Sequence, residues 1–190
     1  MECKCTPEEG KRMVDEMHAE LMERAAELLP AEDLDRVEAA YQLAAKAHAT
    51  QFRKSGIPYI THPISVARTA LVELNLGTNS IMAALLHDVV EDTDYTIEDI
   101  RDAFGDDVAF LVDVLTKKDS GEYKVSKQID NFKQMLDSIN YDIRALLIKL
   151  SDRLHNMRTL GSMRTDKQMK IASDRKSTRL NSSHSSQPRM

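Results

Sequence analysis

Residues 79–92 have the sequence NSIMAALLHDVVED, and this stretch decides the fold class. In a helix it would be apolar on nearly every side, with Asn79 or Ser80 as the N-cap. A helix that is apolar all round is a central one, buried by its neighbours. We therefore expect 79–92 to be a single core helix with other elements packed around it.

The segments on both sides also show helical periodicity, with apolar residues three and four positions apart. Thr96, with Asp99 three residues later, resembles a capping box at the start of one of them. Strand signals are weak, and the sequence has no internal repeat. The expected helices cover 7–29, 33–51, 63–76, 79–92, 96–104, 106–116, 126–138, 141–160 and 166–172. The prediction is an all-α fold with one domain.

Proline and glycine set the ends of several helices. Pro30 ends the first one, and 52–61 (FRKSGIPYIT) is expected to be a loop because glycine and proline interrupt the pattern. Pro63 suits the first turn of the next helix, where its missing N–H costs nothing. We expect that helix to stop at Gly77, since glycine is common just after a helix.

The composition indicates a globular protein of the cytoplasm. The chain has 190 residues, of which 42% are hydrophobic and 30% charged, and its net charge of −5 argues against a general nucleic-acid binder. An anionic substrate would then need a local cationic site or a metal. Neither a membrane span nor a secretion signal is present. Cys3 and Cys5 are too few for a disulfide framework or a four-cysteine zinc site.

The C-terminal part differs from the rest of the chain. A polar connection is expected at 117–125, and 173–190 (SDRKSTRLNSSHSSQPRM) has no apolar face, so we expect disorder there. Because the helix at 166–172 is cut off abruptly, we favour a truncated coding sequence followed by foreign residues over a native flexible tail. Residues 1–30 would form the N-terminal helix of the domain, and 31–172 its functional, C-terminally incomplete part.

Two histidines and two aspartates are candidates for a metal site: His62, His87, Asp88 and Asp152. Imidazole and carboxylate together suit Mn²⁺, Fe²⁺ or Zn²⁺. Four such ligands from three helices would leave room for water or a substrate oxygen. A histidine before proline is more often a cap or loop residue, and an isolated His-Asp pair is weak evidence.

Asp88 and Asp152 both follow strongly apolar runs, IMAALL and RALLIKL, with one residue between the run and the aspartate in each case. Ionised aspartates are rarely buried without a partner. A shared metal would supply the counter-charge. A buried salt bridge to Arg153 or Arg158 is the competing explanation.

Glu91 and Asp92 lie four residues after His87 and Asp88, so in a continuous helix each pair shares a face. Carboxylates there could orient a metal-activated water or relay its proton. The alternative is a plain acidic helix end, which the helix dipole disfavours.

Further polar residues could contact a substrate. Arg53, Lys54 and Ser55 could hold phosphates or a base, although adjacent basic residues usually belong to a solvated loop. Asn156 follows Asp152 by four residues and so faces the same way. His48 and His155 are interpreted as core histidines or as supports of the ligands, not as ligands.

Three separated motifs together resemble the hydrolase domain of RelA/SpoT-type alarmone enzymes, a member of the HD phosphohydrolase superfamily. They are AHATQFRKSGIPYITHPISVA, LLHDVVEDTDYTIEDIRDAFGDDV and IKLSDRLHNMRTL, and the resemblance covers about 25–172. It implies an HD-domain helical bundle. It also implies removal of the 3′-pyrophosphate from (p)ppGpp, which gives GDP or GTP and pyrophosphate.

The resemblance also assigns roles to residues. It implies one Mn²⁺ held by His62, His87, Asp88 and Asp152, and a catalytic pair at Glu91 and Asp92. The guanine nucleotide would contact Arg53, Lys54, Ser55 and Asn156.

The chain departs from long family members in having no segment that resembles a synthetase, so we expect the synthetase and regulatory domains of a full-length protein to be missing. We expect a guanine nucleotide as partner, and neither membrane nor direct nucleic-acid binding. The alternatives are an HD phosphohydrolase for another nucleotide, a non-catalytic module that senses nucleotide or regulates a partner domain, and a chain that does not fold stably. The missing helices beyond MRTL could leave Asp152 without cover.

Overall fold

A computed structural model of the chain describes residues 5–53, 55–116 and 142–159. Within those ranges the regular structure is helical, and the one β-type contact is an isolated bridge between Phe52 and Pro58. The all-α prediction is confirmed. The chain divides into two compact units, Met1–His155 and Asn156–Met190, and the packing described below is that of the first.

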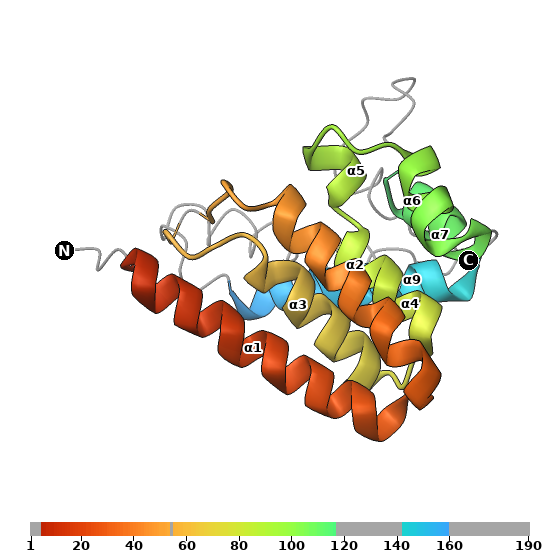
Figure 1. Cartoon of the computed structure of the whole chain (residues 1–190), viewed down its shortest axis with the longest axis horizontal. Helices are drawn as coiled ribbons and strands as arrows, with labels where there is room; N and C mark the ends of the chain where they lie inside the picture. The colour runs from red at the N-terminus through yellow and green to blue at the C-terminus, as the bar shows by residue number, and fades with distance from the viewer. Residues whose placement is uncertain (1–4, 54, 117–141, 160–190) are drawn as a thin grey trace, which may run out of the picture. The chain divides into compact units, whose positions relative to one another are not determined.

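The helices follow one another along the chain as Figure 1 shows. They are α1 (Pro7–Leu28), η1 (Ala31–Asp33), α2 (Leu34–Ala47), α3 (Thr61–Arg68), η2 (Thr69–Glu73), α4 (Thr78–Leu86), α5 (Val89–Asp92), α6 (Ile97–Phe104), α7 (Asp106–Thr116) and α9 (Ile143–Arg158). Within the described ranges no helix is both long and apolar enough to cross a membrane.

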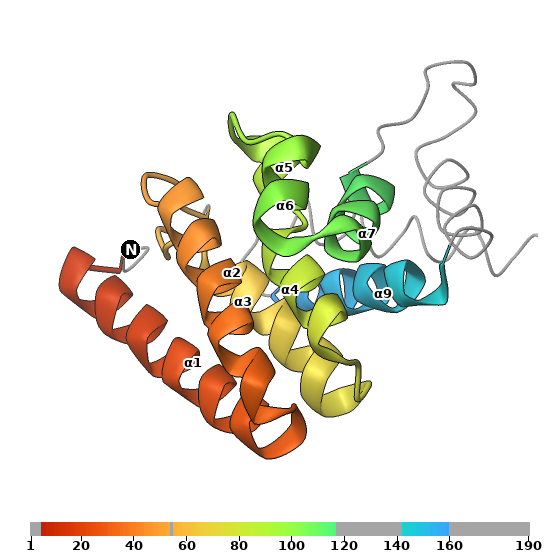
Figure 2. The ribbon, with the colours of Figure 1, turned by 45° about the vertical axis from the view of Figure 1, so that its right-hand side comes forward.

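Helix α4 is the core of the first unit. Every residue of α4 except Asn79 is buried, and the helix packs against α2, α3 and α7 (Figure 2). Its Ile81, Met82, Leu85 and Leu86 are fully buried, and burying each such side chain contributes about 1.5–3 kcal/mol. The expectation of a central apolar helix in this stretch is confirmed.

The prediction of a single helix over 79–92 is nevertheless wrong, because the stretch forms two helices. The chain leaves α4 at His87, and Asp88, with φ −97° and ψ −8°, precedes the separate short helix α5. At the other end, the helix begins at Thr78 with Gly77 as the N-cap. Asn79 does not cap the helix, because its amide donates to Asp107 Oδ2 at 2.7 Å.

The helix expected to stop at Gly77 also ends earlier. After α3 the backbone widens into one π-helical stretch, η2, and Asn75 then takes the left-handed conformation with φ 51°. Gly77 is extended, with φ −78° and ψ 174°. Asparagine tolerates the left-handed region better than most residues, and so it can replace glycine at this position.

Local signals elsewhere are confirmed. Thr96 and Asp99 form the expected capping box at the start of α6, and Thr6 with Glu9 forms another at the start of α1. Pro63 lies in the first turn of α3. The expectations for 117–125, 126–138, 166–172 and 173–190 fall outside the described residues.

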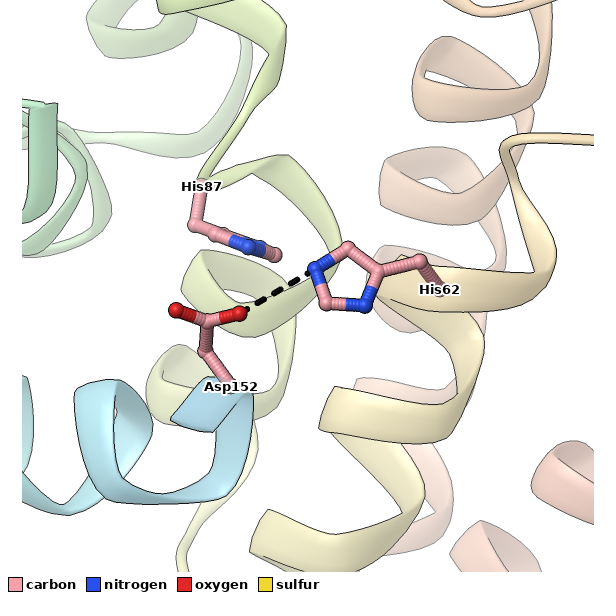
Figure 3. A group of neighbouring side chains, drawn as sticks. All are labelled: His62, His87 and Asp152. Atoms are coloured by element: carbon pink, nitrogen blue, oxygen red, sulfur yellow. Dashed lines mark ion pairs between the residues drawn. The ribbon is translucent and has the colours of Figure 1, made fainter. Parts of the chain in front are cut away.

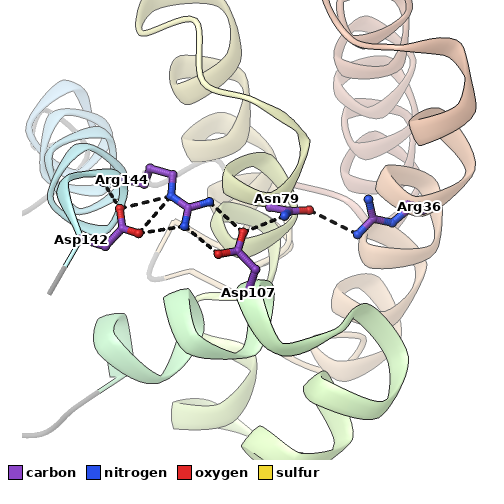
Figure 4. A network of polar contacts seen from close by, with 5 residues as sticks. All are labelled: Arg36, Asn79, Asp107, Asp142 and Arg144. Carbon is purple, nitrogen blue, oxygen red and sulfur yellow. Dashed lines mark hydrogen bonds and ion pairs between the residues drawn. The ribbon is translucent and has the colours of Figure 1, made fainter.

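The start of α9 is fastened to the core by an arginine (Figure 4). Arg144 donates to both carboxylate oxygens of Asp107 at 2.7 Å and to Asp142 Oδ2 at 2.8 Å. Asp107 also accepts from Asn79, whose Oδ1 accepts from Arg36 at 3.2 Å. This network joins α2, α4 and α7 to the helix that carries Asp152.

Replacing Asp107 by asparagine tests this network. The hydrogen bonds from Arg144 hold the pKa of Asp107 below its usual value, despite an opposing effect of burial, and Asn79 lowers it further. A lowered folded-state pKa stabilises the fold above the unfolded value of about 3.9, and this contribution is lost as the pH falls through the folded-state value. We expect Asp107→Asn to lower the free energy of unfolding at pH 7 by about 1 kcal/mol, since the ion pair is partly exposed.

Urea unfolding between pH 7 and pH 3 measures the effect, which should shrink toward the acid end. The matched control is Asp106→Asn, because the Asp106 side chain is 91% exposed and pairs only at the surface with Arg101. This account would be contradicted if Asp107→Asn and the parent had the same free energy of unfolding at pH 7, or if their difference were as large at pH 3 as at pH 7.

Candidate metal centre

Three side chains from separate parts of the chain converge at the candidate site (Figure 3). His62 lies in the first turn of α3, His87 follows α4 directly, and Asp152 lies on α9. One ligand atom from each lies within 4.8 Å of the others. His62 Nε2 lies 3.2 Å from Asp152 Oδ1.

Asp88 lies against the same two histidines. Its Oδ2 is 3.2 Å from His87 Nε2 and 3.6 Å from His62 Nε2. The structure therefore brings together all four side chains that the sequence pattern singled out as metal ligands.

The orientation of His87 fits a metal ligand. Its Nδ1 lies 2.8 Å from the carbonyl oxygen of Ala84, so Nδ1 donates and Nε2 is the nitrogen that faces the carboxylates. His87 Nε2 is buried and makes no hydrogen bond, since the approach of Asp88 lacks hydrogen-bond geometry. In the neutral ring Nε2 is a buried acceptor without a donor, which is costly, and a cation beside two carboxylates would satisfy it. Backbone-oriented imidazoles of this kind are usual at metal centres.

The charges of the four groups also suit a cation. Burial raises the pKa of Asp88, but His87, Tyr59 and His62 outweigh it, and the pKa ends well below its usual value. The pKa of Asp152 is likewise lowered, against the effect of burial, chiefly by a hydrogen bond from His62. Burial lowers the pKa of His62. The site thus holds ionised carboxylates and a neutral imidazole, the forms in which these groups bind metals.

His87 shows the opposite pKa shift from His62. Burial lowers its pKa, but the charges of Asp88 and Asp152 raise it by more. The two carboxylates therefore favour positive charge at His87 Nε2, which either a proton or a metal cation can supply. Metal binding at this position would displace such a proton.

Tyr59 is a member of the site that the sequence analysis missed. Its hydroxyl donates to Asp88 Oδ2 at 2.6 Å, and its ring lies 5.9 Å from that of His62 and 4.8 Å from that of His48. Burial and the charge of Asp88 raise the pKa of Tyr59, so the hydroxyl stays protonated and remains a donor. Its only signal in the sequence is its place three residues before His62.

The loop with the basic residues lies beside the site. Arg53 Nη1 is 3.0 Å from His155 Nε2, and the His155 ring lies 4.9 Å from that of His62. Gly56, with φ 82°, allows the tight turn in which the Arg53 N–H donates to the Ile57 carbonyl at 2.8 Å. His155 thus supports the site without being one of the converging ligands. Ser55 lies in the same turn, and Lys54 lies outside the described residues.

Glu91 and Asp92 are not part of the group of side chains that converges at the candidate site. Glu91 and Asp92 are exposed on α5. The Asp92 N–H donates to the Asp88 carbonyl, so the backbone still makes a helical turn between these two residues although α4 ends before them. Asn156 lies one turn after Asp152 on α9, at the start of the second unit. The roles of these three residues stay predictions.

A family model described as HD domain matches residues 40–178. The chain belongs to the HD-domain family. A bifunctional (p)ppGpp synthase/hydrolase SpoT of Escherichia coli (strain K12) is 49% identical over 146 residues, 76% of this chain and 21% of the relative. A guanosine-3′,5′-bis(diphosphate) 3′-pyrophosphohydrolase of Haemophilus influenzae is 49% identical over 134 residues, 70% of this chain and 20% of the relative. This HD-family chain thus spans about a fifth of the length of these relatives.

A solved structure is also similar to this HD domain. It is described as "A metazoan ortholog of SpoT hydrolyzes ppGpp and plays a role in starvation responses". The TM-score is 0.61 at 34% sequence identity, and the match covers 75% of this chain and 80% of that chain. The resemblance to the RelA/SpoT-type hydrolase domain, and with it the HD-type helical fold, is confirmed.

The Tyr59–Asp88 hydrogen bond gives a prediction about metal affinity. We expect Tyr59→Phe to weaken Mn²⁺ binding by roughly 10-fold, because partners that orient a ligand typically contribute 10- to 100-fold. The ring and its packing are kept. Isothermal titration calorimetry with Mn²⁺ measures the change, and Tyr95→Phe, a half-buried tyrosine on the connection to α6, is the matched control. Equal affinity in Tyr59→Phe and the parent would show that Tyr59 does not orient a ligand.

Proposed function

We propose that this chain is a metal-dependent hydrolase that removes the 3′-pyrophosphate from guanosine tetra- or pentaphosphate and yields GDP or GTP and pyrophosphate. The observation that carries the proposal is the convergence of two buried histidines and two aspartates from α3, the turn after α4, and α9. The names of the relatives at 49% identity support the substrate.

We propose that His62, His87, Asp88 and Asp152 hold one divalent ion, and that the ion is Mn²⁺. Mixed imidazole and carboxylate ligands support a borderline-hard ion of this type. When bound, such an ion supplies Lewis-acid stabilisation of phosphate charge and lowers the pKa of water. We also place the protein in the cytoplasm, where guanine nucleotides are made.

The remaining residues would bind the nucleotide and handle protons. Arg53, held beside the centre by His155, offers a planar guanidinium to a phosphate or a guanine face, and Lys54, Ser55 and Asn156 would complete the contacts. Exposed on α5, Glu91 and Asp92 would accept the proton of the attacking water. Since Asp88 and Asp152 repel a phosphate, nucleotide binding should depend on the cation.

The direct test is pyrophosphate release from ppGpp by the purified chain with and without Mn²⁺. We expect release that requires Mn²⁺ and falls at least ~100-fold in His87→Ala, since loss of a ligand removes the metal's contribution of several kcal/mol. Mn²⁺ titration should show weakened binding in the same variant. The control is His18→Gln, because His18 pairs with Glu38 between α1 and α2.

The rival functions predict other results. Equal activity on simple nucleoside monophosphates would identify a phosphohydrolase for another nucleotide. Binding of ppGpp without turnover, in a chain that melts cooperatively, would identify a nucleotide-sensing or regulatory module. Both results would contradict the proposed reaction.

A further inference from the structure

A second set of hydrogen bonds reaches α5 from the end of α2, apart from the proposed metal ligands. His48, the C-cap residue of α2, is only 2% exposed, and its Nδ1 lies 2.7 Å from Gln51 Oε1. Gln51 Nε2 in turn donates to the backbone carbonyl of Asp92 at 3.0 Å. The chain His48–Gln51–Asp92 therefore ends on one residue of the acidic pair.

The direction of each bond in this chain is fixed. A carbonyl oxygen only accepts, so the NH₂ group of Gln51 must face Asp92 and its Oε1 must face His48. His48 Nδ1 therefore carries the proton and donates. Only this arrangement of the Gln51 amide satisfies both contacts, because a flipped amide would place its oxygen against the Asp92 carbonyl and lose that hydrogen bond.

Helix α5 needs such an anchor. It has four residues, too few for an isolated helix to be stable. Its first residue, Val89, is buried in the core, but the chain becomes extended at Thr93, with φ −141° and ψ −179°. Gln51 holds the far end, where Glu91 and Asp92 are exposed.

Gln51 also touches the other side of the site. Its backbone carbonyl accepts from the Tyr59 N–H at 2.9 Å, and Tyr59 is the residue that donates to Asp88. The loop after α2 thus contacts the metal centre through Tyr59 and the acidic turn through the Gln51 side chain. Replacing only the Gln51 side chain separates the two effects.

We infer that Gln51, held by His48, is a positioning residue that fixes the acidic turn of Glu91 and Asp92 relative to the metal centre. It acts through the Asp92 backbone and does not touch substrate. The inference deepens the proposed hydrolase function and rests on it for the role of the acidic pair.

The test uses two variants of Gln51. Gln51→Leu keeps the approximate size of the side chain and removes both hydrogen bonds. Gln51→Glu keeps an acceptor for His48 but places a second oxygen against the Asp92 carbonyl. The control is Gln42→Leu, since Gln42 is an exposed residue of α2 whose amide donates a hydrogen bond to Glu38 on the same helix. We expect kcat for ppGpp to fall roughly 10-fold in both Gln51 variants. KM and Mn²⁺ affinity should stay within about twofold, because the metal ligands and the Tyr59 contact are kept.

A parallel fall in kcat and Mn²⁺ affinity would overturn the inference, as it would indicate a general structural defect. So would a kcat equal to that of the parent. Hydrogen exchange of residues 89–93 gives a readout that needs no turnover: Gln51→Leu should speed exchange there and leave α4 unchanged. Unchanged exchange at 89–93 would also overturn the inference, whereas an inactive parent with the expected exchange pattern would count against the proposed reaction alone.

Discussion

The constraint on which this structure depends is the placement of two partly buried, ionised carboxylates beside two buried histidines. Asp88 and Asp152 lie near His62, with Oδ–Nε2 distances of 3.6 and 3.2 Å. Burying charges is costly unless they are compensated, and here both pKa values are lowered by the histidines. A cation bound among these groups would compensate the charge most fully, which links the stability of the site to the chemistry proposed for it.

Different elements of the fold have different roles in forming this arrangement. Helix α4 is buried on nearly every side and provides the core, and the break after Leu86 turns His87 and Asp88 toward α3 and α9. Arg144 fastens the start of α9 through Asp107, so that Asp152 is presented from a fixed helix. The loop 48–59 supplies the supporting hydrogen bonds through Gln51 and Tyr59. The four proposed ligands therefore lie on elements that other contacts hold in place.

The sequence was sufficient for the helical class, the core position of α4 and the convergence of four candidate ligand side chains, because each depends on local patterns or on motifs with specific residue types. Helix ends depended on tertiary contacts: Asn79 bonds Asp107 instead of capping α4, and Asn75 takes the turn expected at Gly77. Tyr59 and Gln51 had no chemical signal of their own, since their importance comes from hydrogen bonds to residues 29 and 41 positions away. Such partners can be found only when the fold brings them together.

The central claim is that these four side chains form one metal site, and anomalous X-ray diffraction from crystals of the chain grown with Mn²⁺ tests it most directly. The account predicts one manganese peak, ligated by His62, His87, Asp88 and Asp152, with the Tyr59 hydroxyl still on Asp88. No peak there at saturating Mn²⁺, or a peak bound by other residues, would contradict it.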